Sequence, residues 1–590
     1  MDKQNVNARS LSIAVIFSLL LLTLAMTACN SSVTKAWQLS SESLSYRGLS
    51  GGEAPAEQTL TITNAGNAAQ SFQLSASAPW LHASPTSGSL EAGAVASVTV
   101  TVDACPSHGT ESATLSIGGA AAASVAVERI CDPAAGELTW ARQTGTENYD
   151  DAGGRGSLAA TDDRVYVGGG GDQLYLAVYD TAGEKLWETI LASSEQDVVI
   201  QALAPAADGG VYAAGSVYGY FELPGYNTAS SGESDAFLAR LSSAGELEWF
   251  VQFGTPEYDD LYGLAVDLHG NVIVSGSTEG DFDDDQASSN GYQAFVASFT
   301  PSGSQSWLEQ LSSSESFVKA TSLGVDDDGN IYIGGVVDGD LPGNTSSGGQ
   351  DVFVAKYSTS GTRLWVRQLG TSEWDSARIL VAAGGVYLSG STYGAFPGFS
   401  NQGTTDAFVA RYDGDGNSKW LYQFGTSSND GAGQLACDEA GNLYVAGNTV
   451  SSNDPNDREI FLSRYDASTG NLVWNKNLGT EDDDDEVHGL VYAGGQLLLT
   501  GRVHEPFDGQ PEIMGSSDIF VASFGAENGE LAWLNQFGSQ PLDTDHNYLE
   551  WPAGMAVGGG FVYVSGSTNG LFPGETLLGE NDLYLAQLKY

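Results

Sequence analysis

Short runs of apolar and aromatic residues, separated by turn residues, recur along most of the chain. Between Trp249 and Trp307 there are four such runs, WFVQFGT, YGLAVD, NVIVSGS and AFVASFT, with Gly, Asn, Asp and Ser between them. Runs of β-branched and aromatic residues bounded by turn residues predict β-strands rather than helices. This stretch therefore predicts a unit of four antiparallel strands.

The four-strand unit repeats through the rest of the chain. A Trp that follows a Gly-containing turn marks each copy, and so do a mid-unit strand that ends in Gly and a third strand such as DAFVARY. A period of roughly 50 to 60 residues is that of a propeller blade. The eight marker residues are Trp140, Trp187, Trp249, Trp307, Trp365, Trp420, Trp474 and Trp533.

The two ends of the repeat region complement each other. The region starts with a lone closing strand, GELTWARQTGT, and it ends with a third strand, DLYLAQLKY, that no closing strand follows. If the first strand completes the last unit, the ring has no exposed β-edge. We therefore expect an all-β chain with an eight-bladed β-propeller over residues 137–590, closed by its N-terminal and C-terminal strands.

The repeats resemble a known family. WVRQLGTSEWDSARI, DAFVARYDGDGNSKWLYQFGT and VYLSGSTYGAFPGF are similar to SBBP-type bacterial β-propeller repeats, and the resemblance covers all eight units. It implies an exported protein and no particular activity. DASTGNLVW and GAENGELAW also resemble the Trp-docking motif of pyrroloquinoline quinone-type propellers, which include dehydrogenases and an outer-membrane assembly lipoprotein. The adjacent Cys pair of those dehydrogenases is missing, so we explain the motif by Trp packing between blades.

Residues 44–132 alternate in strand fashion and predict an immunoglobulin-like β-sandwich. TLTITNAGNAAQSFQLSASAPWLHASPTSGSLEAGAVASVTVTV resembles BACON-type modules of bacterial surface proteins. The family name implies carbohydrate binding, with Trp80 as a stacking platform, but a Trp at this place is more often a core or strand-edge residue. Residues 133–136 are expected to link the sandwich to the propeller.

Residues 1–28 predict a targeting segment. Lys3 and Arg9 precede an apolar stretch that is too short to span a bilayer, and LAMTAC at its end resembles a bacterial lipobox with Met26 where Leu is usual. The resemblance implies cleavage before Cys29 and lipidation of that residue, with Asn30 favouring the outer membrane. Residues 29–43 would form a tether. The alternative is an ordinary secretory signal with an incidental Cys.

The other cysteines suit an exported protein. Cys105 and Cys131 lie near the ends of two predicted strands, so we expect a disulfide between them. Cys437 takes the place of an apolar residue in the repeat and is interpreted as buried and inert.

The composition limits the partners. The chain has 74 acidic and 22 basic residues, a net charge of −52, which excludes nucleic acid and a bare anionic membrane surface. The charge is interpreted either as a solvated exterior or as a means of attracting Ca²⁺ or basic partners. Contact with a membrane would come only through the lipid anchor, and we expect a monomer.

One face of the expected propeller should bind any partner. It carries the long loops between the second and third strands of each unit, four of which contain Leu-Pro-Gly or Phe-Pro-Gly, and the loops that join successive units. Acidic residues recur in the joining loops, with Lys319 replacing the acid in the fourth unit. They form either a ring that holds Ca²⁺ or a basic partner, or repeated turn caps that accept backbone N–H groups. They are Asp150, Asp151, Asp197, Asp259, Asp260, Asp375, Asp430, Asp484, Asp485, Asp543 and Asp545.

The sequence contains no catalytic or cofactor motif. Its six His form no metal-ligand spacing, and it has no nucleophile elbow, phosphate loop or dinucleotide fingerprint. We therefore expect a non-enzymatic, lipid-anchored binding or scaffold protein of the cell envelope, whose ligand is a protein or a glycan. The alternatives are a carbohydrate-active enzyme that uses carboxylates on the loop-rich face, and an envelope-assembly lipoprotein.

Overall fold

The structure of the chain is a computed structural model, and all regular structure in the part that it describes is β. The chain divides into two compact units, Met1–Ala134 and Ala135–Tyr590. Among the described residues no helix is long and apolar enough to cross a membrane. Residues 1–36, with the predicted signal segment and Cys29, lie outside that part. The described residues are 37–119, 122–146, 150–152, 156–218, 223, 232–282, 291–315, 317–450, 458–480, 485–513, 516–540, 550–579 and 581–590, without the side chains of 151, 172 and 192–197.

The first unit is a sandwich of a four-stranded and a five-stranded sheet. Apolar side chains from both sheets alternate with exposed ones and form a single core, which includes Leu60, Val98, Leu115 and Val125. In spatial order the sheets are β1 (Trp37–Leu39), β3 (Gln58–Asn64), β7 (Val95–Val102) and β5 (Leu81–Ser84), and β2 (Ser43–Leu49), β9 (Ala123–Asp132), β8 (Gly109–Gly118), β4 (Gln70–Ala76) and β6 (Ser87–Leu90).

The sandwich begins earlier than the sequence pattern predicted. Residues 37–39, assigned to the tether, form β1 and pair with β3. Trp37 is 2% exposed and packs edge-on against Phe72, with ring centroids 6.0 Å apart. The prediction of a tether to residue 43 was wrong because a three-residue strand is too short to show alternation, although burying a Trp stabilises it strongly.

The cysteine pairing is confirmed, and Trp80 lies at the edge of the core. Cys105 and Cys131 form a disulfide with their Cα atoms 5.6 Å apart. The half-buried Trp80 packs against the core, and the guanidinium of Arg129 lies 4.6 Å from the centroid of its ring. Arg129 also donates to the backbone carbonyls of Asp103 and Ala104. This position fits the structural role for Trp80.

Removing the disulfide should destabilise the sandwich alone. A chain with both Cys105→Ala and Cys131→Ala is expected to unfold its sandwich with about 3 kcal/mol less stability, because the bond closes a loop of 26 residues in the unfolded chain. Calorimetry that resolves two transitions would measure this, with Cys437→Ala as the control. A shift of the propeller transition instead would contradict it.

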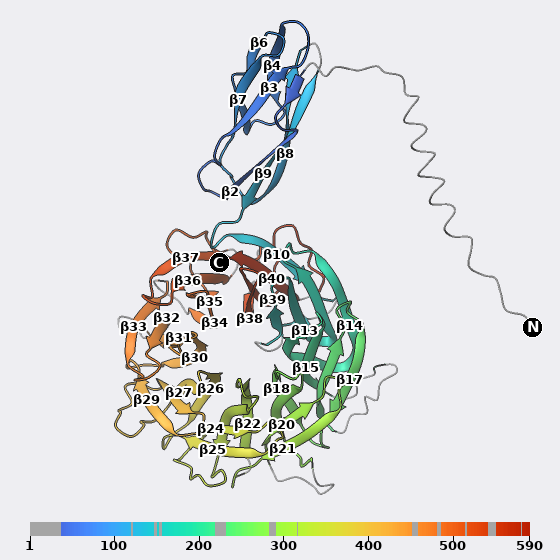
Figure 1. The fold of residues 1–590 in the computed structure, drawn as a ribbon. Helices are drawn as coiled ribbons and strands as arrows, with labels where there is room; N and C mark the ends of the chain where they lie inside the picture. Colours follow the sequence, from blue (N-terminus) through green and yellow to red (C-terminus); the bar gives the residue numbers. More distant parts are fainter. Residues whose placement is uncertain are drawn as a thin grey trace, which may run out of the picture. The chain divides into compact units, whose positions relative to one another are not determined.

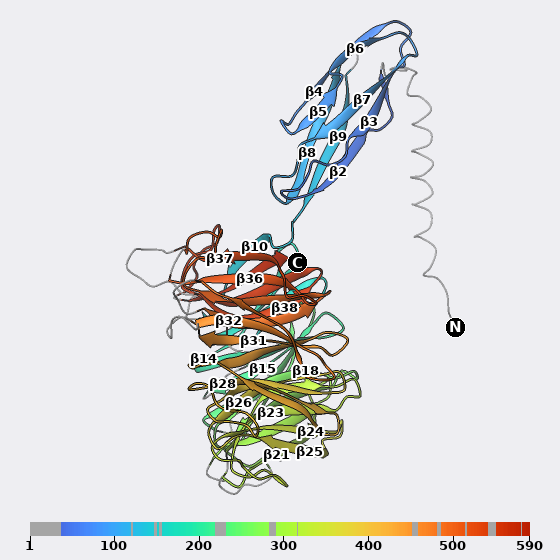
Figure 2. The ribbon, with the colours of Figure 1, turned by 90° about the vertical axis from the view of Figure 1, so that its left-hand side faces the viewer.

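The second unit is a ring of radially arranged sheets (Figures 1 and 2). Six sheets have four antiparallel strands each, and we call each of these a blade. From inside to outside they are β18 (Asp259–Val266), β19 (Val272–Thr278), β20 (Gln293–Phe299) and β21 (Gln305–Leu311); β22 (Phe317–Val325), β23 (Ile331–Asp338), β24 (Asp351–Tyr357) and β25 (Arg363–Leu369); β26 (Asp375–Ala382), β27 (Gly385–Thr392), β28 (Asp406–Asp413) and β29 (Ser418–Phe424); β30 (Gly431–Cys437), β31 (Leu443–Val450), β32 (Arg458–Tyr465) and β33 (Leu472–Leu478); β34 (Glu486–Ala493), β35 (Gln496–Val503), β36 (Asp518–Gly525) and β37 (Leu531–Phe537); and β38 (Glu550–Gly558), β39 (Phe561–Thr568), β40 (Asp582–Lys589) and β10 (Leu138–Thr144).

The first two copies of the repeat share one seven-stranded sheet. Two strands in it are long because each runs through two positions of the repeat, so hydrogen bonding does not separate the copies. The blade number of eight therefore stays a prediction from the repeat count. The sheet contains β11 (Asp150–Asp151), β12 (Leu158–Ala160), β13 (Arg164–Asp180), β14 (Lys185–Pro205), β15 (Val211–Tyr218), β16 (Ser234–Leu241) and β17 (Leu247–Phe253).

The ring closes as the sequence predicted. β10, from the start of the repeat region, pairs antiparallel with β40 at the end of the chain, in register from Leu138 opposite Leu588 to Thr144 opposite Leu583. This pairing covers the hydrogen-bonding edge that β40 would otherwise expose.

The repeated Trp residues join neighbouring sheets, in agreement with the packing explanation. Trp365 Nε1 donates to the carbonyl of Gly414 in the next blade at 3.0 Å. A Cβ added to Gly416 in that turn would lie 2.8 Å from the Trp365 ring, and the φ of Gly416 is +76°. Only glycine allows both this contact and this backbone conformation.

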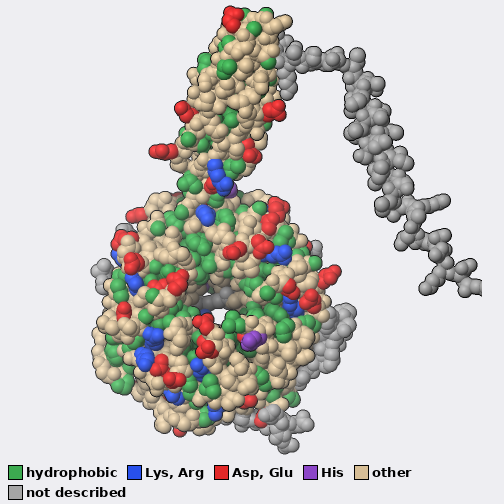
Figure 3. Space-filling view, in the orientation of Figure 1, with side chains coloured by type: hydrophobic (Ala, Val, Ile, Leu, Met, Phe, Trp, Pro, Cys, Tyr) green, Lys and Arg blue, Asp and Glu red, His purple; other side chains and the backbone are tan. Residues whose placement is uncertain are grey.

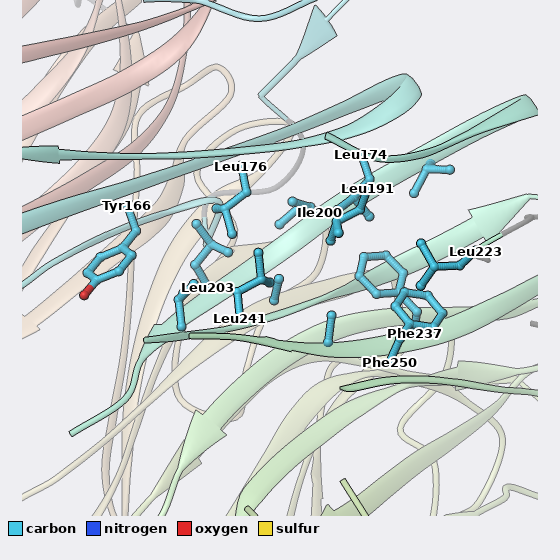
Figure 4. Packing of buried hydrophobic residues seen from close by; sticks show 14 of the residues in the cluster. Tyr166, Leu174, Leu176, Leu191, Ile200, Leu203, Leu223, Phe237, Leu241 and Phe250 are labelled. Carbon is cyan, nitrogen blue, oxygen red and sulfur yellow. The ribbon is translucent and has the colours of Figure 1, made fainter. Parts of the chain in front are cut away.

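Buried apolar side chains fill the spaces between successive sheets. Figure 4 shows one such cluster, in which Leu176 and Leu191 of one copy pack with Ile200, Phe237 and Phe250 of the next. Strands buried on both faces explain why runs such as DVFVAKY show no alternation.

Candidate functional site

Five of the predicted acids in the joining loops are buried turn caps. Each carboxylate accepts the backbone N–H of a Thr at the start of its loop, at 2.6 Å in each case, and is no more than 3% exposed. An acid enclosed in this way cannot present its charge to a partner, so the structure favours the turn-cap interpretation over the acidic ring. These residues are Asp150, Asp259, Asp375, Asp430 and Asp485.

The remaining predicted acids do not form a ring among the described residues. Asp260 is half-buried and accepts hydrogen bonds from the hydroxyls of Tyr218 and Tyr262, at 3.2 and 3.3 Å. The side chains of Asp151 and Asp197 are outside the description, as are Asp484, Asp543 and Asp545 entirely. In the described residues no three His, Cys, Asp or Glu converge in a way that could hold a metal ion.

The fourth copy departs from the predicted pattern in a different way. The buried Val318, not Lys319, takes the capping position, because its N–H donates to Tyr292 O just as Asp375 N–H donates to Gln350 O. Lys319 takes the place of the predicted acid Asp260, since it pairs with Val336 as Asp260 pairs with Ser277, and the loop before it is one residue longer in this copy. The ammonium of Lys319 instead lies 3.7 Å from the centroid of the Tyr292 ring.

A second set of buried acids was not predicted. An Asp at the start of a blade's third strand accepts a hydrogen bond from the amide of a Gln on the outermost strand, over 2.6 to 3.1 Å. The signal was present, since the third strands read DAF, DVF, DIF or DLY, but acids are too common in this chain to single these out. They are Asp235, Asp351, Asp406, Asp518 and Asp582.

The last copy has Glu550 as its capping residue, which the sequence analysis also missed. Its Oε1 accepts the backbone N–H of Ser539 at 2.9 Å, and the side chain is fully buried. It lies eleven residues beyond Ser539, whereas the usual spacing is four, so the local pattern did not reveal it.

The two sets of acids meet at the junctions between blades. A Cβ on Gly254 would lie 2.1 Å from Asp235 Oδ1 and 2.7 Å from Asp259 Oδ2, so both carboxyl groups enclose this glycine. Burial, with a smaller contribution from the neighbouring acid, raises the pKa of Asp259 and of Asp375 to about 6. The same causes raise the pKa of Glu550 to about 7.

The inner surface of the ring contains a cavity. This cavity, of about 430 Å³ along the innermost strands, is lined by small and polar residues, among them Ser376, Ser391, Gln434 and Asn448, and by Arg378. No carboxylate contributes to this described lining. Figure 3 shows acidic side chains spread over the visible face of the propeller, with basic ones between them. On this face the charge is therefore distributed rather than focused.

Cys437 is half-buried on β30 rather than fully buried as expected. Its thiol donates to the carbonyl of Asp438 at 3.4 Å, and burial raises its pKa to about 11. A thiol that stays protonated at neutral pH is a poor nucleophile, which agrees with the inert role.

One accessible cleft lies between two blades. It has a volume of about 470 Å³ and is lined by Tyr422 and Phe424 of β29, by Phe461 and Tyr465 of β32, and by polar residues that include Asp430. Its size falls in the range of small-ligand pockets.

Family models match both parts of the chain. Residues 37–128 match the model described as viral BACON domain, and residues 248–283 match the model described as β-propeller repeat, SBBP. The chain is therefore similar to a BACON domain over residues 37–128 and to one SBBP repeat over residues 248–283. Both resemblances predicted from the sequence are therefore confirmed, and the BACON match begins at Trp37, where the sandwich begins.

Individual relatives are distant. The regulatory protein FlaEY of Caulobacter vibrioides is 26% identical over 302 residues, which make up 45% of this chain and 31% of that protein. The chain thus spans less than a third of this curated relative. The polysaccharide lyase Uly1 shares 11% identity over 77% of this chain and 99% of its own, with a TM-score of 0.40. The propeller domain of the trilobed protease from Pyrococcus furiosus shares 11% identity over 63% of this chain and 95% of its own, with a TM-score of 0.32.

Proposed function

We propose that this protein is a non-enzymatic binding or scaffold module of the cell envelope. The BACON domain serves as a stalk, the loop-rich face of the SBBP propeller contacts the partner, and the lipid on Cys29 holds the chain at the membrane. One observation supports the non-enzymatic role most: the acids that recur in the joining loops are buried and accept hydrogen bonds from residues of the turns. Such acids stiffen the frame that carries the long loops.

Partner capture tests the binding role. The full chain, immobilised through a C-terminal tag, is expected to retain an envelope protein or glycan from a detergent extract. Heat-unfolded chain on the same support is the control, because it keeps the charge of −52 but loses the loop arrangement. Equal capture by both would show only charge-driven adsorption and would contradict the proposal.

A carbohydrate-active enzyme is the second candidate, favoured by a single observation. Asp430 lines the accessible cleft, and Asp406 lies close to it, since a Cβ on Gly425 would contact both carboxyl groups. Paired carboxylates beside a pocket are the machinery of glycosidases. Release of new sugar ends from an envelope polysaccharide, abolished by Asp430→Asn, would replace the non-enzymatic proposal.

Lipidation of Cys29 is directly testable. Replacing Cys29 with Ala is expected to move the protein from the detergent phase to the aqueous phase, because acyl chains supply the membrane affinity. Phase partitioning of cell extracts would show this, with Cys437→Ala as the matched control. Unchanged partitioning of the Cys29→Ala chain would rule out the anchor.

A further inference from the structure

In most blades one apolar residue from the loop between the second and third strands fills the gap next to the preceding sheet. We call these plug residues, and each is at least largely buried. The backbone N–H of each donates to the side-chain oxygen of a Gln on the outermost strand, over 2.9 to 3.1 Å. They are Phe282, Leu341, Phe396, Phe507 and Phe572.

The blade made of β30 to β33 has no residue of this kind in its sequence. After Val450 its corresponding loop reads SSNDPND, without an aromatic or aliphatic residue, before β32 begins at Arg458. This loop lies outside the described residues. A polar loop of this kind has no side chain with which to fill an apolar gap.

The two outer strands of the same blade also have polar residues where other blades have apolar ones. In other blades an Ala on the third strand pairs with a large apolar residue on the fourth, as Ala410 does with Leu421 and Ala297 with Leu308. Here Ser463 pairs with Asn475. The Gln and Asp that are hydrogen-bonded in other blades are both replaced as well. Asn477 donates to Glu459 at 2.8 Å here, whereas Gln423 donates to Asp406 in the preceding blade. The sequence of this blade therefore lacks a plug residue, and the wall of the gap carries polar side chains where other blades have apolar ones.

The cleft between β29 and β33 is this gap. Its aromatic walls match those around a plug residue. At the site of Phe282, the ring of Phe253 lies 6.0 Å from Phe295 and 5.3 Å from Phe299. In the cleft, the ring of Phe424 lies 5.6 Å from Phe461 and 6.3 Å from Tyr465. Phe282 packs beside these rings, 6.4 Å from Phe253 and 5.6 Å from Phe295, so the cleft keeps the aromatic surface that holds a Phe elsewhere in the ring.

The polar rim of the cleft is already organised. Ser463 Oγ donates to Asn475 Oδ1 at 2.6 Å, and the amide of Asn475 donates to Asn477 Oδ1 at 3.3 Å. The amide groups of Asn475 and Asn477 are thus already paired with Ser463, with each other and with Glu459. An occupant must therefore gain its affinity from an apolar group, and edge-to-face contact with two rings adds to the burial of its area.

We propose that the cleft between β29 and β33 is a docking site for an aromatic side chain on an extended, basic segment of a partner protein, which takes the place of the missing plug residue. The internal plugs define the chemistry, a Phe or Leu that in all five cases is followed by Pro or lies within two residues of Gly. The net charge of −52 favours basic flanks on the partner. The inference rests on the proposed binding function and adds the class of partner to it.

A peptide built on the chain's own plug tests the site. The probe is the segment Gly394–Phe399, GAFPGF, flanked by two Lys on each side, and its control has Ala in place of the residue that corresponds to Phe396. Calorimetric titration of the full chain is expected to show binding of the probe at least ten times tighter than that of the control. A probe with a photoreactive Phe at the same place should crosslink to the peptides that contain Tyr422, Phe424 or Phe461. Equal binding of probe and control, no binding at millimolar concentration, or crosslinks elsewhere would overturn the proposal.

Filling the cleft gives a second, independent test. The double variant Ser463→Ala with Asn475→Leu restores the pair found in other blades and should weaken probe binding at least tenfold while raising Tm. Lys476→Arg on the same strand is the matched control. The ammonium of Lys476 donates to Glu530 of the next blade at 3.1 Å, and the substitution keeps the positive charge. Unchanged probe binding in the folded double variant would contradict the site.

The same variants separate this inference from the proposed function. If the wild-type chain captures envelope partners but binds no probe, and the filled variant captures them equally well, then the docking site is wrong and the binding function stands. If the wild-type chain captures nothing from the envelope extract, the proposed function itself fails. Preferential binding of neutral oligosaccharides in the cleft, competing with the probe, would also overturn the aromatic docking site.

Discussion

Lowering the pH from 8 to 5 is expected to raise the melting temperature of the propeller. Burial raises the pKa of Asp259 and Asp375 to about 6 and that of Glu550 to about 7 in the folded chain. In the unfolded chain these carboxyl groups titrate near 4. Between the two sets of values the folded chain binds more protons than the unfolded chain, so stability falls as the pH rises.

The size of the effect follows from the shifts. A shift of about two units corresponds to about 3 kcal/mol for each group. This stabilisation is fully present below the unfolded pKa values and is lost as the pH rises through 6 to 7. Thermal unfolding at pH 5, 6, 7 and 8 and constant ionic strength would measure it.

The negative charge of the surface also makes the chain more stable at lower pH, because protonation reduces repulsion. A single substitution separates that effect from the titration of the buried acids. Glu550→Gln keeps the acceptor oxygen for Ser539 and removes the charge. The variant is therefore expected to be more stable than the natural chain at pH 8 by about 2 to 3 kcal/mol and to match it at pH 5. Glu527→Gln, at an exposed turn position, is the control and should change the stability neither at pH 8 nor at pH 5. A variant with the same pH dependence as the natural chain would show that Glu550 titrates normally.

Deleting the strand that closes the ring should have the largest effect on the fold. Without residues 137–144, β40 stays paired with β39 but loses its outer partner, and the apolar side chains around Leu588 and Val562 lose their cover. We expect the propeller to melt more than about 10 °C lower or to lose its cooperative transition, because an open ring exposes a strand edge and part of its core. Differential scanning calorimetry of the full chain and of the deletion would measure the change.

Moving the strand provides the matched control. β40 ends beside the start of β10, since Leu588 faces Leu138. The same eight residues attached after Tyr590 through a short turn can therefore form the outermost strand of this blade directly. This rearranged chain is expected to recover most of the lost stability. Failure to recover it would mean that the N-terminal position of the strand, and not the strand itself, holds the ring together.

The buried capping acids could be predicted only in those copies where they lie at the usual distance along the sequence from the start of the joining loop. The spacing from Thr to Asp appears in most copies, so the sequence identified Asp259 and Asp375 but could not choose between a turn cap and a charged ring. That choice depends on burial, which the rest of the blade determines. Glu550 and Val318 were missed or misplaced because a change in loop length moves the capping position along the sequence while leaving it fixed in space.

The sequence by itself determined the all-β class, the propeller repeat, the closing strand, the disulfide and the two families. Each of these is local or periodic, since turn residues, aromatic strands and complementary end fragments recur at fixed spacing. The tertiary structure alone decided that Trp37 belongs to the sandwich, that the recurring acids are buried, and that an aromatic cleft lies between β29 and β33. The physical reason is that burial, pKa and an unfilled gap depend on side chains from neighbouring sheets, which are far apart along the chain and meet only after the ring has closed.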